Sequence, residues 1–177
     1  MKKIIGLERG RVRLSPYNPR WKKLYEQERK RIVSVIGGHI LDIQHVGSTS
    51  IPGVKAKPII DIAIGVRDLK TGRNCIKPLE ELGYEYKHDA GIKGRHFFAK
   101  GSEKNRTYYV HVEKLNGQLW KNHILFRDYL RAHKQAVREY NKIKEGLAEK
   151  YKDDRDSYSA EKNSFIEEII RKAERNR

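Results

Sequence analysis

The stretch HVGSTSIPGVKAKPIIDIAIGV, residues 45–66, joins a small, hydroxyl-rich turn to an apolar segment that contains a single carboxylate. The β-branched residues of segment 58–66 alternate. This pattern predicts a strand with three isoleucines on a buried face and with Asp61 and Ala63 on the opposite face. An unpaired carboxylate is costly to bury, so Asp61 should face a cleft or contact a cation. The strand and the turn before it therefore predict where the functional site lies.

The turn at residues 47–49 has the chemistry of a phosphate-binding loop. Glycine lets backbone amides approach an anion closely and the hydroxyls add donors, although such a turn is also common as a helix cap. His45, just before the turn, either donates to a phosphate or packs beneath the turn. Lys57 either pairs with a phosphate as a mobile charge or is a surface lysine.

Hydrophobic periodicity predicts the other elements. A helix should begin at Asn18 and Pro19, which suit a cap and a first helical position, and should end at Gly37. Strands are expected at 40–46, 84–86, 95–100 and 107–113, with a helical segment at 68–82 that is interrupted at Pro78. Three helices are expected after the last strand, at 119–132, 134–151 and 157–175. We therefore predict an α/β (α+β) fold in a single domain, 1–177, with a mixed α/β core at about 12–118 and C-terminal helices at about 119–177.

The predicted strand 107–113 places Thr107, Tyr109, His111 and Glu113 on one face. If it neighbours the Asp61 strand, His111 and Glu113 converge with Asp61 and can bind a transition metal or divide acid and base roles. The alternative is that Glu113 ends the strand in solvent and that His111 is a hydrogen-bonded structural residue.

Two pairs of polar residues in the predicted helices also have structural interpretations. Arg127 and Asp128 lie in an apolar-rich helix, which favours an ion pair that docks the helices onto the sheet over a catalytic role. Tyr140 and Lys144 are one helical turn apart and could line a cleft, but we expect solvated packing.

Lys and Arg number 39 against 23 Asp and Glu, so the net charge is +16. Such a potential attracts phosphates, RNA or another polyanion, although excess Lys and Arg on solvated helix faces also serve solubility. The single cysteine, Cys75, excludes an intramolecular disulfide and a cysteine-built zinc site, and is typical of a reducing compartment. No window approaches the roughly 20 apolar residues that span a membrane, so we expect a cytoplasmic protein without a membrane partner.

Five motifs follow one another along the chain: LSPYNPRW at 14–21, HVGSTSIPG at 45–53, KPIIDI at 57–62, YVHV at 109–112 and FRDYL at 126–130. In this order they resemble the GrpB-like family, which shares the nucleotidyltransferase fold. The resemblance covers roughly residues 12–151. A related domain is appended to some dephospho-CoA kinases, which suggests a nucleotide-related setting.

In the wider superfamily, a Gly-Ser turn is followed by a strand of the form Asp-hydrophobic-acid, and a further acid lies on a neighbouring strand. Those acids hold Mg²⁺, which neutralises a triphosphate and helps a hydroxyl reach the α-phosphorus. Gly47, Ser48 and Asp61 match the first elements of this pattern. Ala63 stands where the second acid would be, which removes a negative ligand from a two-metal site.

The resemblance implies binding of a nucleotide or other phosphorylated small molecule, with Mg²⁺-assisted nucleotidyl or phosphoryl transfer from a nucleoside triphosphate. Ser48 and Thr49 would hold phosphate, Asp61 the metal, and His111 would be a second ligand or an acid/base group, with Glu113 as a further ligand. One alternative is a catalytically degenerate basic module that binds RNA or another polyanion. Another is an accessory domain of a partner enzyme.

Overall fold

The centre of the molecule is a mixed five-stranded sheet in the order β1-β2-β5-β4-β3, in a computed structural model that describes residues 4–176. Its strands are β1 (Asp42–Val46), β2 (Ile60–Val66), β3 (Tyr84–Tyr86), β4 (Arg95–Lys100) and β5 (Tyr108–Lys114). β2 and β5 pair in parallel, and the other neighbouring strands are antiparallel. The sheet and its flanking helices confirm the predicted mixed α/β fold class.

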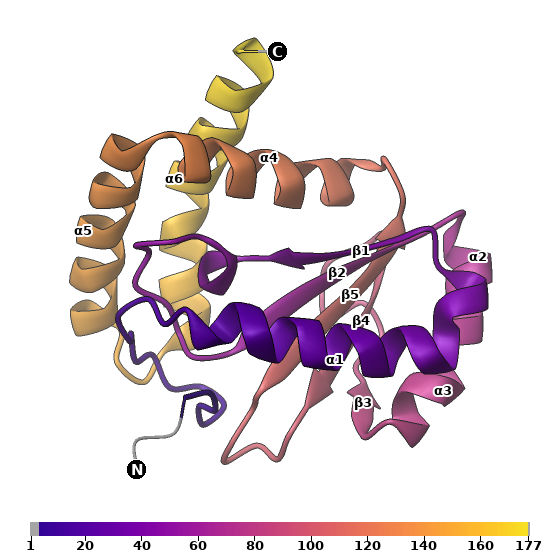
Figure 1. Cartoon of the computed structure of the whole chain (residues 1–177). Coiled ribbons are helices and arrows are strands. Elements are labelled where there is room, and N and C mark those ends of the chain that lie inside the picture. The colour runs from indigo at the N-terminus through magenta and orange to yellow at the C-terminus, as the bar shows by residue number, and fades with distance from the viewer. Residues whose placement is uncertain (1–3, 177) are drawn as a thin grey trace.

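One face of the sheet is covered by α1 (Arg20–Ile36), α2 (Leu69–Gly72) and α3 (Ile76–Glu81), as Figure 1 shows. The first helix begins at Arg20, one residue after its predicted start, and the Asn18 Oδ1 atom accepts a hydrogen bond from the backbone amide of Arg20 at 3.0 Å. Trp21 and Ile32 of α1 pack against the isoleucines of β2, in the largest apolar cluster. The residues of β2 alternate because one face of the strand packs its isoleucines against α1, whereas the other face carries Asp61.

The predicted helical segment 68–82 is divided into α2, a 3₁₀ turn at Arg73–Cys75 and α3. Asp68 caps α2, because its side chain accepts from the Thr71 amide at 2.7 Å. Pro78 lies in the first turn of α3, where its missing amide donor is tolerated. Gly83 follows α3 with a φ of +90°, and β3 begins at the next residue.

On the other side of the sheet, α4 (Gln118–Ala132) packs against the strands, and α5 (Lys134–Lys150) and α6 (Arg155–Arg175) pack against α4 and against each other. A second apolar cluster joins them to the loop before β2, through residues that include Ile51, Phe126, Leu130 and Ile169. The last helix begins two residues before its predicted start because the Asp154 side chain accepts from the Ser157 amide at 3.0 Å. Within residues 4–176, no helix is long and apolar enough to cross a membrane.

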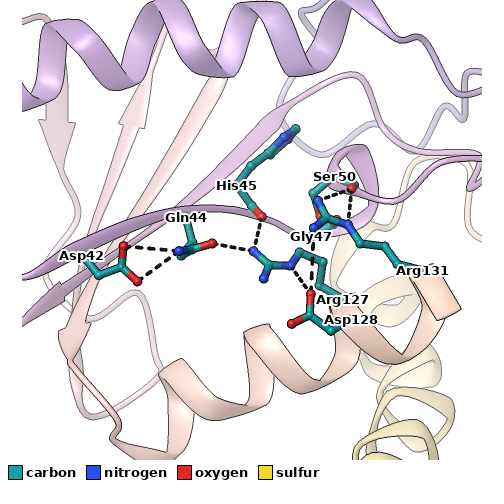
Figure 2. Close-up of polar contacts among 8 residues, drawn as sticks. All are labelled: Asp42, Gln44, His45, Gly47, Ser50, Arg127, Asp128 and Arg131. Carbon is teal, nitrogen blue, oxygen red and sulfur yellow. Dashed lines mark hydrogen bonds and ion pairs between the residues drawn. The ribbon is translucent and has the colours of Figure 1, made fainter.

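Two arginines attach α4 to β1 and to the turn that follows it (Figure 2). Arg127 is paired with Asp128 at 2.7 Å and also donates to Gln44 Oε1 at 2.8 Å. Arg131 donates from Nε and Nη2 to the Ser50 carbonyl at 3.1 and 2.8 Å. The predicted docking role of the Arg127–Asp128 pair is confirmed, and Arg131 adds a second attachment between α4 and the turn.

Candidate functional site

The turn after β1 lies directly against Asp61 of β2. Gly47 has φ +69° and ψ −175°, a backbone region that is essentially restricted to glycine. A Cβ atom at this position would lie 2.8 Å from Asp61 Oδ2. The following residues, Ser48–Ser50, form a 3₁₀ turn, and Ser50 Oγ donates to the Gly47 carbonyl at 2.6 Å. Glycine is therefore required for the turn to bring its hydroxyl groups beside the carboxylate.

The parallel pairing of β2 and β5 brings Asp61 and His111 together. The His111 Nε2 atom lies 3.2 Å from Asp61 Oδ1, and its Nδ1 atom lies 3.0 Å from Nη1 of Arg95. A guanidinium only donates hydrogen bonds, so Nδ1 is the acceptor and Nε2 carries the proton that is donated to Asp61. Ala63 is the register partner of His111, so the imidazole stands beside the position of the missing second acid.

The Asp61–His111 pair consists of a carboxylate and a neutral imidazole at neutral pH. Burial raises the pKa of Asp61, but the hydrogen bond from His111 and the charge of Lys57 outweigh burial, so that the pKa is lowered. Burial lowers the pKa of His111, and the neighbouring Asp61 only partly opposes this shift. Asp61 therefore offers a negative charge to a metal ion or to a cationic group.

Three lysines from three different segments gather near Asp61: Lys57 before β2, Lys144 on α5 and Lys162 on α6. The Lys144 Nζ atom donates to Ser48 Oγ at 2.9 Å. Burial lowers the pKa of Lys57 to about 7 and that of Lys162 to about 8, and repulsion from neighbouring cations adds to both shifts. Burial also lowers the pKa of Lys144 well below its ordinary value. A polyanion would compensate these crowded cations.

These side chains line a cavity of about 810 Å³, bounded by the sheet and the C-terminal helices. The volume falls in the range of small-molecule sites. The lining includes eight Lys or Arg residues and three acids. Ile59, Phe97, Ala99 and Tyr109 form an apolar cluster and also line the cavity. The cavity therefore suits a ligand that has both anionic groups and an apolar or ring-shaped part.

Six of the predicted site residues line this cavity: Gly47, Ser48, Thr49, Lys57, Asp61 and His111. His45 is not part of the described lining. Its ring stacks on Tyr25 of α1 with 4.8 Å between the ring centroids, and in Figure 2 it points away from α4. Its Nε2 atom lies 3.0 Å from Thr49 Oγ1, and burial lowers its pKa to about 3. This geometry supports the interpretation that His45 packs beneath the turn, rather than the interpretation that it donates to a phosphate.

Glu113 is brought to the same face of β5 as His111, but its contact is with α4. It is 1% exposed, so the alternative that it ends the strand in solvent is wrong. Its Oε1 atom lies 3.1 Å from Nε2 of His123. His111, Glu113 and His123 therefore form a cluster next to Asp61, and His123 was not identified from the sequence.

The helices contribute cavity residues that the sequence did not single out, among them His123, Arg155 and Lys162. The expectation of solvated packing for Tyr140 and Lys144 is wrong, because each is only 1% exposed. Both continue the buried stripe of α5 that begins at Ala136, in which every fourth residue is buried. A lysine within such a stripe is the sequence feature that could have identified this position. His123, Arg155 and Lys162 lack a comparable feature, because they lie among many polar residues.

Comparison with known proteins places these observations in a family. The family model described as GrpB protein matches residues 11–172. The glutamate-rich protein GrpB of Alkalihalophilus pseudofirmus is 39% identical over 171 residues, which cover 94% of this chain and 98% of that protein. A dephospho-CoA kinase of Mycolicibacterium paratuberculosis is 27% identical over a match that covers 94% of this chain and 47% of the kinase.

Solved structures show the same relationship. The crystal structure of the conserved protein GrpB from Enterococcus faecalis has a TM-score of 0.84 and 33% sequence identity, and the match covers 91% of this chain and 96% of that one. The Cid1 poly(U) polymerase has a TM-score of 0.51 at 10% identity, and the match covers 76% of this chain and 44% of the polymerase. At that identity the likeness concerns the fold alone, and it confirms the predicted nucleotidyltransferase-like fold.

Proposed function

This chain belongs to the GrpB protein family, and we propose that it binds a nucleotide or another phosphorylated small molecule in its basic cavity. The observation that carries the proposal is the position of Lys57, Lys144 and Lys162 near Ser48 and Asp61. The positive charges repel one another, and Asp61 is an acid close enough to act on the pKa of all three lysines. A polyphosphate would compensate several of these charges at once, and its oxygens match ammonium and hydroxyl donors.

In the proposed complex the phosphates lie at the turn and the remainder of the ligand lies on the apolar cluster. Ser48, Thr49 and Lys144 donate to phosphate oxygens, and Lys57 adds a mobile positive charge. Asp61 holds Mg²⁺, which commonly binds through one or two carboxylates together with phosphate oxygens. Phe97 and Tyr109 offer an apolar surface for a base or another ring.

We propose Mg²⁺-assisted nucleotidyl transfer as the reaction class to test at this site. In such a reaction the oxygen of an acceptor hydroxyl attacks the α-phosphorus of a triphosphate, the hydroxyl proton passes to water, and pyrophosphate leaves. Both ring nitrogens of His111 are already engaged, with Arg95 and with Asp61. His111 therefore acts in this proposal as a positioning residue that orients the carboxylate, rather than as a general base.

Calorimetric titration with the four common nucleoside triphosphates, with and without Mg²⁺, tests the binding proposal. We expect Lys144→Met to weaken binding on the order of tenfold or more, because it removes an amine that would donate to the anion as an ammonium group, a hydrogen bond worth about 1.5–3 kcal/mol. Lys142→Met is the matched control, since Lys142 is an exposed lysine of the same helix. Asp61→Asn should remove the Mg²⁺ dependence. The absence of binding to all four triphosphates by the folded wild-type protein would overturn the proposal.

The basic-module hypothesis gives different results in the same titration. Binding through dispersed Lys and Arg residues predicts that Lys142→Met and Lys144→Met weaken binding equally, and that affinity for RNA falls steeply with salt. Such an outcome would replace the cavity as the binding site. The accessory-domain hypothesis stays a prediction, and copurification of a partner enzyme would test it.

A further inference from the structure

We propose that His111, Glu113 and His123 form a binding site for a divalent transition metal, separate from the Mg²⁺ position at Asp61. One ligand atom from each of the three residues lies within 4.8 Å of the other two. His111 and Glu113 come from the same face of β5, and His123 comes from α4. Three ligands from two elements that pack against each other can enclose one ion after small side-chain movements.

The state of Glu113 is the first observation that points to a cation. Its side chain is 1% exposed, and its Oε2 atom has no hydrogen-bond partner among the described residues. Its other oxygen is paired with His123, which is a weak compensation for a buried carboxylate when the imidazole is neutral. Buried polar groups without a partner are rare in native proteins and commonly mark an ion or water position. A metal ion bound by Glu113 would compensate the carboxylate.

The orientation of His111 is the second observation. Its Nε2 proton is donated to Asp61 at 3.2 Å, which leaves the lone pair of Nδ1 for a positive group. A histidine that donates one ring nitrogen to a carboxylate and offers the other to a metal is the usual arrangement at metal sites. Nδ1 already faces a cation, because Nη1 of Arg95 lies 3.0 Å from it.

Arg95 is therefore the group that must withdraw when a metal binds. Its guanidinium is also held through Nε by the Asp89 carbonyl at 3.0 Å, so Arg95 would keep this hydrogen bond if Nη1 moved away from His111. Arg95 and Glu113 are register partners on neighbouring strands, which explains why a cation lies near this carboxylate in the metal-free arrangement. The metal and the guanidinium compete for the same lone pair.

The chemical types of the three ligands determine which metal ion fits the site. Two imidazoles and one carboxylate suit Zn²⁺ and related transition metals, whereas Mg²⁺ prefers oxygen ligands. Three protein ligands leave a coordination position open, as in catalytic rather than structural zinc sites. His111 and His123 both line the cavity, so the open position faces the space assigned to the phosphorylated ligand. Metal binding by the three side chains does not itself require that ligand.

The test is a calorimetric titration of the tag-free, EDTA-treated and dialysed protein with Zn²⁺, and separately with Mg²⁺. We expect one Zn²⁺ per chain at a site that Mg²⁺ does not occupy. His123→Ala and the near-isosteric Glu113→Gln should each weaken Zn²⁺ binding on the order of 100-fold or more, because loss of a direct ligand exceeds the effect of losing an outer-shell partner. His39→Ala is the control, since His39 is exposed and lies outside the cluster.

Two further variants separate metal binding at this cluster from metal binding elsewhere on the protein. Arg95→Gln should bind Zn²⁺ at least as tightly as the wild type, because it frees the Nδ1 lone pair. Lys142→Met, at an exposed lysine of α5 outside the described cavity lining, should leave Zn²⁺ binding unchanged. Circular dichroism would establish that each variant is folded. The proposed metal site is overturned if the folded wild-type protein does not bind Zn²⁺, or if folded His123→Ala and Glu113→Gln bind it as the wild type does.

Discussion

Replacement of Gly47 by alanine tests whether the turn and Asp61 are built as one unit. The backbone at Gly47 has φ +69° and ψ −175°, where a residue with a side chain costs on the order of 1–3 kcal/mol. The new Cβ atom would lie 2.8 Å from Asp61 Oδ2, so the carboxylate must move and its 3.2 Å hydrogen bond with His111 is weakened. Part of that loss is recovered by water, because the Asp61 side chain is 30% exposed. We expect the free energy of unfolding to fall by about 2–4 kcal/mol, which corresponds to a Tm lower by roughly 4–16 °C.

Urea unfolding followed by circular dichroism measures this effect, and Gly146→Ala supplies the matched control. Gly146 lies in the exposed part of α5, and an added Cβ atom there meets no atom within 4 Å. Alanine in a helix interior is more stable than glycine by about 0.5–1 kcal/mol, so this variant should gain stability. The same substitution is thus expected to have opposite signs at the two positions. A neutral or stabilising effect of Gly47→Ala would refute the reasoning.

Three further predictions concern the charged groups. Anion binding should raise the lowered pKa of Lys57, about 7 in the free protein. At pH 8 the protein should therefore take up protons on binding a triphosphate, and affinity should increase as the pH falls from 9 towards 7; a binding enthalpy that is independent of the buffer would contradict this. Lys100→Met should destabilise the protein by about 3 kcal/mol in urea unfolding, because Glu28 is 0% exposed and would lose its 2.6 Å ion-pair partner; a loss below about 1 kcal/mol would show that Tyr84 and Arg31 suffice as partners of Glu28. Arg127→Met should speed amide exchange in β1 and α4, and unchanged exchange would count against its docking role.

Local patterns were sufficient to predict most elements of the fold. β3 and β4 occupy the predicted residues 84–86 and 95–100, because alternation and flanking glycines act within a few residues. The alternation in β2 also predicted that Asp61 lies opposite the buried isoleucines. The order of the strands did not follow from such patterns, since β5 inserts between β2 and β4 through contacts distant in sequence. The resemblance of the motifs supplied the fold family that periodicity alone could not.

The candidate site was predictable where strands form it and poorly predictable where helices complete it. The contact between Asp61 and His111 was predictable because it depends only on β2 and β5 being neighbouring strands. The contribution of His123 depends on how α4 crosses the sheet, and that of Lys144 depends on how α5 packs against the turn. A long polar side chain on a basic helix looks the same in sequence whether it faces water or a cavity. The burial of Glu113 was equally hard to predict. This charged residue lies near the end of a strand, but α4 covers it.

The register of the sheet shows which side chain stands beside Ala63, the residue at the position of the second acid. His111 stands directly across from Ala63, so a neutral imidazole replaces a negative charge where a second metal ion would need one. Lys57, Lys144 and Lys162 supply positive charge on the side of the turn. In the proposed complex, positive charge for the phosphates would thus come mainly from the protein, and Asp61 without a second acid would hold one Mg²⁺ ion at most. Under the proposed function, this arrangement favours binding of a phosphorylated ligand over transfer by two Mg²⁺ ions, and the proposed transfer would use one Mg²⁺ ion together with lysines that stabilise the leaving phosphate.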